Sequence, residues 1–408
     1  MAMKQTQTKL FDFSDVGLDF SAGSKNLFPD RFKKMLALGY NEQTVSSVAV
    51  AGNQVTFIYG GTHGYVADRV LKVNAPELLS INGGEFVIDS VTENTVTMTI
   101  DGAPTSIAGN FTTKVASLGW ELEYENANIH VYKFNALDES GLYIRLCFQD
   151  QAGRRNCISP CIGKTFDPLT GFITDGFALA VNKEIMSPGV DFKWEFASAA
   201  NTTHNNYTYS QGYSTYGLAK VVGSPYHFML LTNGYTGSTR SMINGIAPCA
   251  TLDYEQLKYP VLIGYTYGSI TSTFDIYEAR NQQARIGNIA VAFNRSWASS
   301  SSTSYIFNST TANSGFLPPE LDNFGTTTVE SLLIYEGATL QQVGALYGLY
   351  QIRSASTSQY PTNYQETPSA TYDIDLSNLV FIHAGGSANS ESTNSHFIAV
   401  PVEEIKIA

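Results

Sequence analysis

The stretch Glu85–Ile100, which reads EFVIDSVTENTVTMTI, is the clearest structural signal in the chain. Apolar and polar residues alternate on both sides of a short Thr-Glu-Asn segment, as they do in two antiparallel strands joined by a tight turn. The apolar residues of this alternation are Phe86, Ile88, Val91, Val96, Met98 and Ile100. The stretch therefore predicts a β-hairpin with one apolar face.

Similar signals surround this hairpin. A second pair of strands is predicted at His130–Phe134 and Leu142–Phe148, joined by a polar turn at Asn135–Gly141. Turn residues recur roughly every 8 to 12 positions, which is typical of β-sandwiches and barrels. Further short β-branched or aromatic segments are Val45–Val50, Gln54–Tyr59, Arg69–Val73 and Gly84–Val91. Residues 1–165 are therefore predicted to form a compact N-terminal β domain that anchors the protein.

A Pro- and Gly-containing linker at Thr165–Thr174 precedes a second series of strand-like segments. They are Gly176–Val181, Tyr226–Thr232, Pro260–Tyr265, Gly287–Phe293, Thr303–Phe307, Ser331–Tyr335, Asn378–His383 and His396–Val402. Polar segments such as Ala197–Tyr216 and Ser354–Ser369 separate them and exceed the usual length of hairpin loops. We expect residues 166–408 to form a C-terminal β domain with long polar loops.

Helical patterns are scarce. Pro29–Leu38 has Pro at its first turn and places Phe32, Met35 and Leu36 on one face, which predicts a short helix. Leu340–Tyr350 predicts another, weakened by two glycines. The predicted fold class is all-β, with two sandwich or barrel-like domains and a few short helices.

The composition points to binding or assembly. Only 15% of the residues are charged and 12% are aromatic, whereas about 25% charged residues is usual. Tyr offers large contact area at little entropic cost. The formal charge of −12 argues against general binding of nucleic acid, because such binding needs clustered Lys and Arg. We predict neither a nucleic-acid nor a membrane partner, because no export signal and no run of about 18 apolar residues is visible.

No catalytic or cofactor site is predicted. Nucleotide-binding, serine-hydrolase and metalloprotease motifs are missing, although a pair of glycosidase carboxylates could hide among the 36 acidic residues. Asp373, Asp375 and Asn378 resemble part of a Ca²⁺ loop but lack its glycine turn and later glutamate. Glu121, Glu123 and Glu125 would line one face of an extended segment. That stripe fits either a cation or basic partner, or the solvated face of a half-buried strand.

The cysteines are Cys147, Cys157, Cys161 and Cys249, too few for a disulfide framework in a chain of this size. Cys157 and Cys161 stand in CISPC, and a zinc site there would need a second close pair or nearby histidines. We expect them to be unbridged, metal-free thiols.

The polar segment Ala197–Tyr216 carries the residues predicted to make contacts. Tyr207, Tyr209, Tyr213 and Tyr216 alternate there with Ser, Thr and Gln. Such a segment either reads a ligand or is buried against a neighbouring subunit, and we expect the subunit contact.

An ordered set of segments in the chain is similar to a known group of proteins. The segments are Gly60–Val73 (GGTHGYVADRVLKV), Gly84–Met98, Val115–Glu123 (VASLGWELE), Val131–Gln149 ending in GLYIRLCFQ, Ser331–Tyr350 and His396–Glu403 (HFIAVPVE). In this order they resemble virion structural proteins of tailed bacteriophages, of the tail or baseplate type. The resemblance covers the first 160 residues and, more sparsely, the last 80.

This resemblance implies a β-rich, non-enzymatic subunit repeated around the tail axis or on the particle surface. Its partners would be copies of itself and other virion proteins. It would be made in the host cytoplasm, released by lysis and located in the virion. Two alternatives stay open: a receptor module that binds a cell-surface glycan through aromatic loops, and a glycan-cleaving enzyme.

Overall fold

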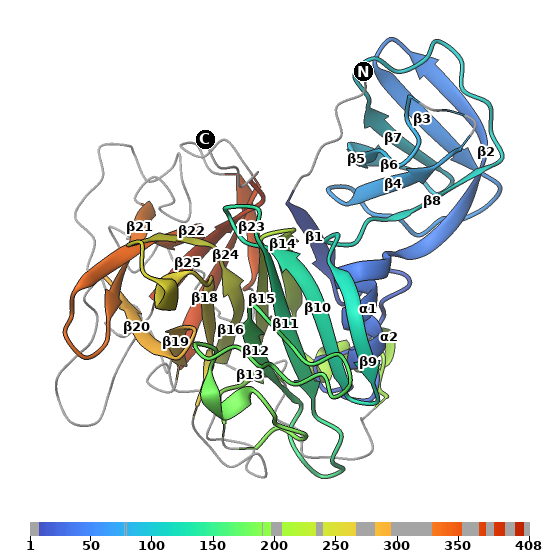
Figure 1. The fold of residues 1–408 in the computed structure, drawn as a ribbon. Helices are drawn as coiled ribbons and strands as arrows, with labels where there is room; N and C mark the ends of the chain where they lie inside the picture. Colours follow the sequence, from blue (N-terminus) through green and yellow to red (C-terminus); the bar gives the residue numbers. More distant parts are fainter. Residues whose placement is uncertain are drawn as a thin grey trace.

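The computed structural model describes residues 8–76, 78, 80–189, 191–196, 206–233, 240–266, 282–294, 329–352, 367–372, 379–387 and 396–403. Within them, antiparallel strands in three sheets dominate and helices are few and short (Figure 1). The all-β prediction is therefore confirmed. No helix of this described part is long and apolar enough to cross a membrane.

The first sheet forms a small lobe of residues 40–115, drawn apart from the rest of the chain in Figure 1. Its seven strands run in the order β5-β4-β8-β2-β3-β7-β6. They are β2 (Tyr40–Ala51), β3 (Gln54–Tyr59), β4 (Val70–Asn74), β5 (Glu85–Val87), β6 (Ser90–Val91), β7 (Thr95–Thr99) and β8 (Phe111–Val115). Alternate residues such as Val55, Phe57, Val96 and Met98 are buried, which matches the predicted period of two.

The predicted hairpin at Glu85–Ile100 is confirmed at its turn and corrected in its first arm. Val91 pairs with Val96 across the turn. Phe86, however, pairs with Leu71 of β4 at the opposite edge of the sheet. The arm breaks between β5 and β6, where the Ile88 amide donates to the Arg69 carbonyl and the Asp89 amide donates to the Thr97 carbonyl. The chain thus crosses from one edge strand to the other.

The second sheet has five strands in the order β13-β12-β11-β10-β9. They are β9 (Glu121–Asn126), β10 (Ile129–Asn135), β11 (Gly141–Phe148), β12 (Cys157–Gly163) and β13 (Trp194–Glu195). The second predicted hairpin is confirmed as β10 and β11, paired from Ile129 with Cys147 to Asn135 with Gly141.

The third sheet, here the large sheet, has thirteen strands and curls back on itself, because β16 pairs with β15, β18 and β24. It contains β1 (Lys9–Asp12), β14 (Ala219–Ser224), β15 (His227–Asn233), β16 (Arg240–Ala247), β17 (Cys249–Thr251), β18 (Val261–Tyr265), β19 (Gln282–Ile286), β20 (Ile289–Phe293), β21 (Val329–Glu336), β22 (Gln342–Ile352), β23 (Ser369–Tyr372), β24 (Leu379–Ser387) and β25 (His396–Pro401). The predicted strand Thr303–Phe307 lies outside the described residues.

Two other predicted elements are wrong. Leu340–Tyr350 is not a helix but most of β22, whose backbone pairs with β17, β21 and β25. Gly176–Val181 is not a strand. The Asp175 carboxylate accepts a hydrogen bond from the Phe177 amide at 2.9 Å, which turns the chain towards a short 3-10 helix, η2 (Ala180–Asn182).

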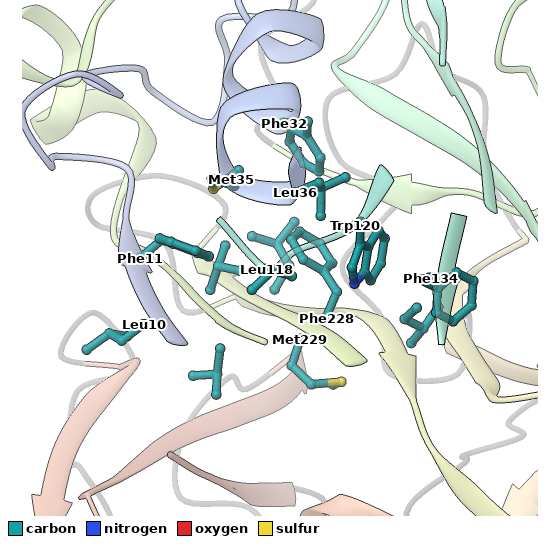
Figure 2. Close-up of a cluster of buried hydrophobic side chains, with 14 of the residues drawn as sticks. Leu10, Phe11, Phe32, Met35, Leu36, Leu118, Trp120, Phe134, Phe228 and Met229 are labelled. Atoms are coloured by element: carbon teal, nitrogen blue, oxygen red, sulfur yellow. The ribbon is translucent and has the colours of Figure 1, made fainter. Parts of the chain in front are cut away.

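The predicted helix at Pro29–Leu38 is confirmed as α1 (Phe28–Lys33) followed by a π-helical turn, η1 (Lys34–Leu38). Phe32, Met35 and Leu36 are buried as predicted. Figure 2 shows them gathered around Trp120 and Phe228. Ring centroids of Phe32 and Phe228 lie 5.7 Å apart. This helix therefore fills the core between the five-stranded and large sheets.

Buried charges tie the small lobe to the remainder of the chain. The Arg69 guanidinium donates two hydrogen bonds of 2.8 Å to the Asp15 carboxylate. The Tyr40 hydroxyl donates to the same carboxylate at 2.8 Å. Asp15 follows β1, and Asp12 of β1 forms an ion pair with Lys220 of β14. One network thus connects the lobe to the large sheet.

Two strand pairings cross the predicted domain boundary at residue 165. Strand β12 pairs with β13, and β1 pairs with β14. The division into 1–165 and 166–408 stays a prediction.

Candidate functional site

A surface cavity of about 240 Å³ lies where the five-stranded sheet meets the large sheet. Its walls come from the β10–β11 turn (residues 135–138), from Tyr226 in the β14–β15 turn, and from residues 248–249, 251–253 and 257–260 in and around β17. Pockets for drug-sized ligands usually measure about 300–1,000 Å³. This cavity therefore suits a single large side chain or a comparably small group.

The cavity is lined mainly by apolar groups. Leu137, Pro248, Leu252, Leu257 and Pro260 supply aliphatic surface. Leu257 is buried, whereas Leu252 is 42% exposed. A group that enters the cavity can therefore cover the Leu252 side chain. This burial is favourable in proportion to the apolar area that it removes from water.

Local hydrogen bonds give the cavity its shape. Cys249 of β17 pairs with Leu346 of β22, and the chain then loops through a short 3-10 helix, η4 (Glu255–Leu257). The Thr251 hydroxyl donates to the Leu257 carbonyl at 3.0 Å. The Cys249 thiol donates to the Tyr259 carbonyl at 3.3 Å. The loop is therefore closed across its base and held against the sheet.

Charged side chains lie along the edge of the cavity that is formed by η4 and its neighbours; we call the charged edge of the cavity its rim. The Lys258 ammonium lies 3.1 Å from Asp253 and 2.8 Å from Glu255. Lys164 lies 2.7 Å from Glu255. Hydrogen bonds from Lys164 and Lys258 lower the pKa of Glu255 to about 2. These exposed pairs contribute little stability, but they keep the rim ionised.

Asp138 is the rim carboxylate on the opposite side, in the β10–β11 turn. The Ser140 hydroxyl and amide donate to its Oδ1 at 2.5 and 3.0 Å. These hydrogen bonds hold the pKa of Asp138 below its usual value. Among the described residues no lysine or arginine forms an ion pair with it. Asp138 is therefore an ionised carboxylate that can accept a cation.

Two tyrosines form fixed walls. The Tyr226 hydroxyl donates to the Glu139 carboxylate, and the Tyr259 hydroxyl donates to Asp175 at 2.7 Å. Because both hydroxyls are engaged within the chain, the rings are held in one orientation. The cavity is thus preformed rather than shaped by its occupant.

The predicted contact residues lie elsewhere in the chain. Tyr209, Tyr213 and Tyr216 belong to a helix, α2 (Tyr209–Tyr216), where a loop was expected. Tyr207 and Tyr209 are partly buried against the core, and the side chains of Tyr213 and Tyr216 lie outside the described part. Their predicted role in subunit contact stays a prediction.

The residues at the start of α2 carry a helix-start signal, although the polar composition of the segment predicted a loop. Gln211 makes one half of a capping box, because its Oε1 accepts hydrogen bonds from the Thr208 amide at 3.5 Å and hydroxyl at 3.1 Å. The Gln211 amide donates to the Thr208 carbonyl and not to the hydroxyl. The Tyr207 carbonyl accepts a hydrogen bond of 2.9 Å from the Ser21 hydroxyl. Ser210 donates from its amide and hydroxyl to Asp19 at 2.9 and 3.0 Å. Part of the predicted loop is therefore docked on its own chain.

The predicted acidic stripe lies on β9, an edge strand of the five-stranded sheet, and its glutamates are exposed. Glu121 lies 3.4 Å from Lys133, and Glu125 lies 2.7 Å from Lys33. Charge on an edge strand also discourages unwanted strand pairing. Both of these glutamates thus face lysines of their own chain.

The four cysteines are free thiols, of which Cys147, Cys157 and Cys161 are buried. Burial raises the pKa of Cys147 and Cys161 to about 12, so both are unreactive near neutral pH. No group of three His, Cys, Asp or Glu in the described part of the chain could hold a metal ion. Asp373, Asp375 and Asn378 lie outside that part.

The cavity could not be predicted from the sequence, because the β10–β11 turn lies more than 80 positions before the other segments that line it. The local signals are Pro248 before β17, Pro260 before β18 and the acidic β10–β11 turn, and none of them indicates a cavity by itself.

Comparisons with known proteins add little to this geometry. No family model and no curated protein matches the chain. Among solved structures it is similar to the phage phi92 endosialidase, with 10% sequence identity and a TM-score of 0.16. That match covers 90% of this chain and 52% of the endosialidase, so the chain spans about half the length of that protein. A likeness at this TM-score carries no argument about fold or activity.

Proposed function

We propose that the chain is a non-enzymatic structural protein of a tailed-phage virion, present in repeated copies in the tail, baseplate or particle surface. Its partners are copies of itself and other virion proteins. It is made in the host cytoplasm and released by lysis.

The observation that carries this proposal is the preformed apolar cavity on a chain of low charge. Leu252 at 42% and Tyr254 at 60% exposure stand at or beside it, and only 15% of all residues are charged. The cores of protein–protein interfaces are depleted in charge and enriched in aromatic residues. A surface built in this way supports contact with another protein better than it supports a reaction.

Quantitative mass spectrometry of purified particles tests the proposal. Particles banded on a density gradient should contain this chain in several copies per particle, in a fixed ratio to the major structural proteins. A chain that stays in the soluble lysate, or that occurs at far less than one copy per particle, contradicts the proposal.

A second candidate is a module that binds a cell-surface glycan. The observation in its favour is that Tyr226 and Tyr259 line the cavity close to the carboxylates of Asp138 and Asp253, and rings and carboxylates both contact sugars. Binding of the isolated protein to a glycan array would favour this function. Release of reducing sugar would instead indicate the glycan-cleaving enzyme.

A further inference from the structure

We propose that the cavity receives Leu38 of a second copy of this chain, with Lys34 of that copy beside the rim carboxylates Asp138 and Asp253. The inference rests on the proposed function as a repeated subunit and names the contact that joins two copies.

The cavity defines what its occupant must be. Its volume of about 240 Å³ and its aliphatic lining suit one apolar side chain. Its rim carries two lining carboxylates, Asp138 and Asp253, against one lining ammonium group, Lys258. Lys258 is shared between Asp253 and Glu255. Its charge also acts on Asp138 at longer range, but no lysine or arginine of the described residues forms an ion pair with Asp138. The best occupant is therefore an apolar side chain that is flanked by a positive charge.

Leu38 meets this description. It is 49% exposed at the end of η1, and Gly39 at φ 74° ends the helix directly after it. Lys34 lies one turn earlier, with its ammonium 3.2 Å from the Gly17 carbonyl and 3.2 Å from the Asp30 carboxylate, which also pairs with Arg31. Lys114 lies across Gly39, within 3.3 Å of the position that a Cβ would occupy. Lys34 and Lys114 thus lie close to the Leu38–Gly39 segment, and the group of Asp30, Arg31 and Lys34 keeps one positive charge in excess.

Other exposed leucines of the described residues fit less well. Leu169 is 86% exposed, but its amide donates to the Asp167 carboxylate at 3.0 Å. Leu340 is 44% exposed and closes a turn that is held by Glu336. Among the described residues the carboxylates of Asp167 and Glu336 form no ion pair, so either leucine would bring an uncompensated negative charge to an acidic rim, and like charges at an interface disfavour it. The Asp30 carboxylate near Leu38 is instead paired with both Arg31 and Lys34.

The two surfaces are different patches of the molecule, so the contact is heterologous. Such contacts generate rings when the rotation closes and filaments when it does not. Either arrangement suits a subunit repeated about an axis. The cavity belongs to one sheet junction and Leu38 to the helix beside the small lobe, so one copy can use both surfaces at once.

The test uses the full chain and sedimentation velocity over a range of protein concentrations. Leu38→Ser should weaken self-association at least tenfold, because it removes the apolar anchor. Leu169→Ser is the matched control, since it changes a more exposed leucine in the same way, and it should associate like the parent chain. The melting temperature checks that both variants are folded.

A charge exchange identifies the partner. Lys34→Glu and Asp253→Lys should each weaken association, and the double variant should recover most of it, because the opposite charges then face one another in reversed order. A parent chain that stays monomeric at about 100 µM overturns the inference. So does equal association of the two serine variants, or a double variant without recovery.

Particle incorporation separates this inference from the proposed function. If Leu38→Ser enters particles as well as the parent chain does, the inference fails while the proposed function stands. If Leu252→Lys blocks incorporation although the purified chain does not self-associate, the cavity receives a different virion protein and the inference is wrong. If the parent chain is absent from particles, the proposed function itself fails.

Discussion

At the scale of single residues, buried charges and buried polar groups decide how the parts are held together. Arg69 and Asp15 are 5% and 6% exposed, and their two hydrogen bonds of 2.8 Å form a bidentate pair. A buried charge that loses its partner is strongly unfavourable, whereas an exposed pair contributes little. The joint between the small lobe and the large sheet therefore depends on this one pair more than on any exposed pair.

Replacing Arg69 should therefore destabilise the chain. Arg69→Ala leaves the Asp15 carboxylate buried without its cation, and we expect it to lower the free energy of unfolding by about 3–5 kcal/mol. Lys72→Ala is the matched control, because Lys72 lies on β4, which begins directly after Arg69, and is 47% exposed and 4.0 Å from Glu85. The control should cost less than about 1 kcal/mol. Urea titration measures both, and equal effects would mean that the pair does not hold the lobe.

A buried histidine should make the chain sensitive to acid. His227 is fully buried, and its Nδ1 lies 2.7 Å from the Ser224 hydroxyl. Its Nε2 has no hydrogen-bond partner in the described part of the chain. Burial lowers its pKa to about 3. Below about pH 6.5 the imidazole of His227 is protonated in the unfolded chain but stays neutral in the folded chain, so stability is lost as the pH falls.

Replacing this histidine should reduce the acid sensitivity. Between pH 7 and pH 5 the free energy of unfolding of the parent chain should fall by about 2 kcal/mol more than that of His227→Gln. Denaturant titrations at the two pH values give the change in the free energy of unfolding between pH 7 and pH 5 for each chain. Comparing these two changes does not depend on the absolute stability of the variant. If the free energy of unfolding falls by the same amount in both chains, His227 titrates normally in the folded chain.

Tyr207 belongs in part to the fold of its own chain. A Cβ at Gly212 would lie 2.1 Å from its ring, so the ring rests directly on the backbone of α2. We expect Tyr207→Ser to lower the free energy of unfolding of the isolated chain by roughly 1–3 kcal/mol. Tyr254→Ser, at a tyrosine that is 60% exposed, should change it little. If both variants unfold like the parent chain, Tyr207 contributes only to contacts between subunits.

At the scale of elements, the sequence predicted strands well where apolar residues alternate, and poorly where strand partners are distant. The turn after Val91 follows from its own residues. The helix wrongly expected at Leu340–Tyr350 has apolar residues that also fit a helical face, and only its pairing with β17, β21 and β25 selects the strand. Conversely, α2 begins in a segment whose polar composition predicted a loop, although Thr208 and Gln211 have the spacing of a capping box and form one of its two hydrogen bonds.

β22 needs a glycine at position 344 because β17 passes very close to its backbone there. A Cβ at this position would lie 2.3 Å from the Ala250 carbonyl oxygen. Gly344→Ala must therefore push β17 away from β22, and we expect a loss of about 1–3 kcal/mol together with a deformed cavity. Gly176→Ala is the control, since nothing lies within 4 Å of its added methyl group. Thermal unfolding and hydrogen exchange of the Leu252 amide, which donates to Val343, report the two effects. A Gly344→Ala variant as stable as the control would show that β17 can move freely.

At the scale of the whole molecule, three antiparallel sheets share one core in which α1 and η1 are central. The fold class and both hairpin turns could be predicted, because they depend on local alternation. The pairing of β1 with β14 joins residues more than 200 positions apart, and no local pattern specifies it. The walls of the cavity also come from segments far apart in the sequence, so they could not be inferred from composition, whereas the lowered pKa of Asp138 follows mainly from its neighbour Ser140.

Electron cryomicroscopy of purified particles is the most direct test of whether many copies of this chain pack together in a virion. We predict symmetry-related density that fits the five-stranded and large sheets, with the cavity beside β17 covered by a neighbouring subunit. Particles whose tail, baseplate and surface densities are all accounted for by other chains would contradict the claim.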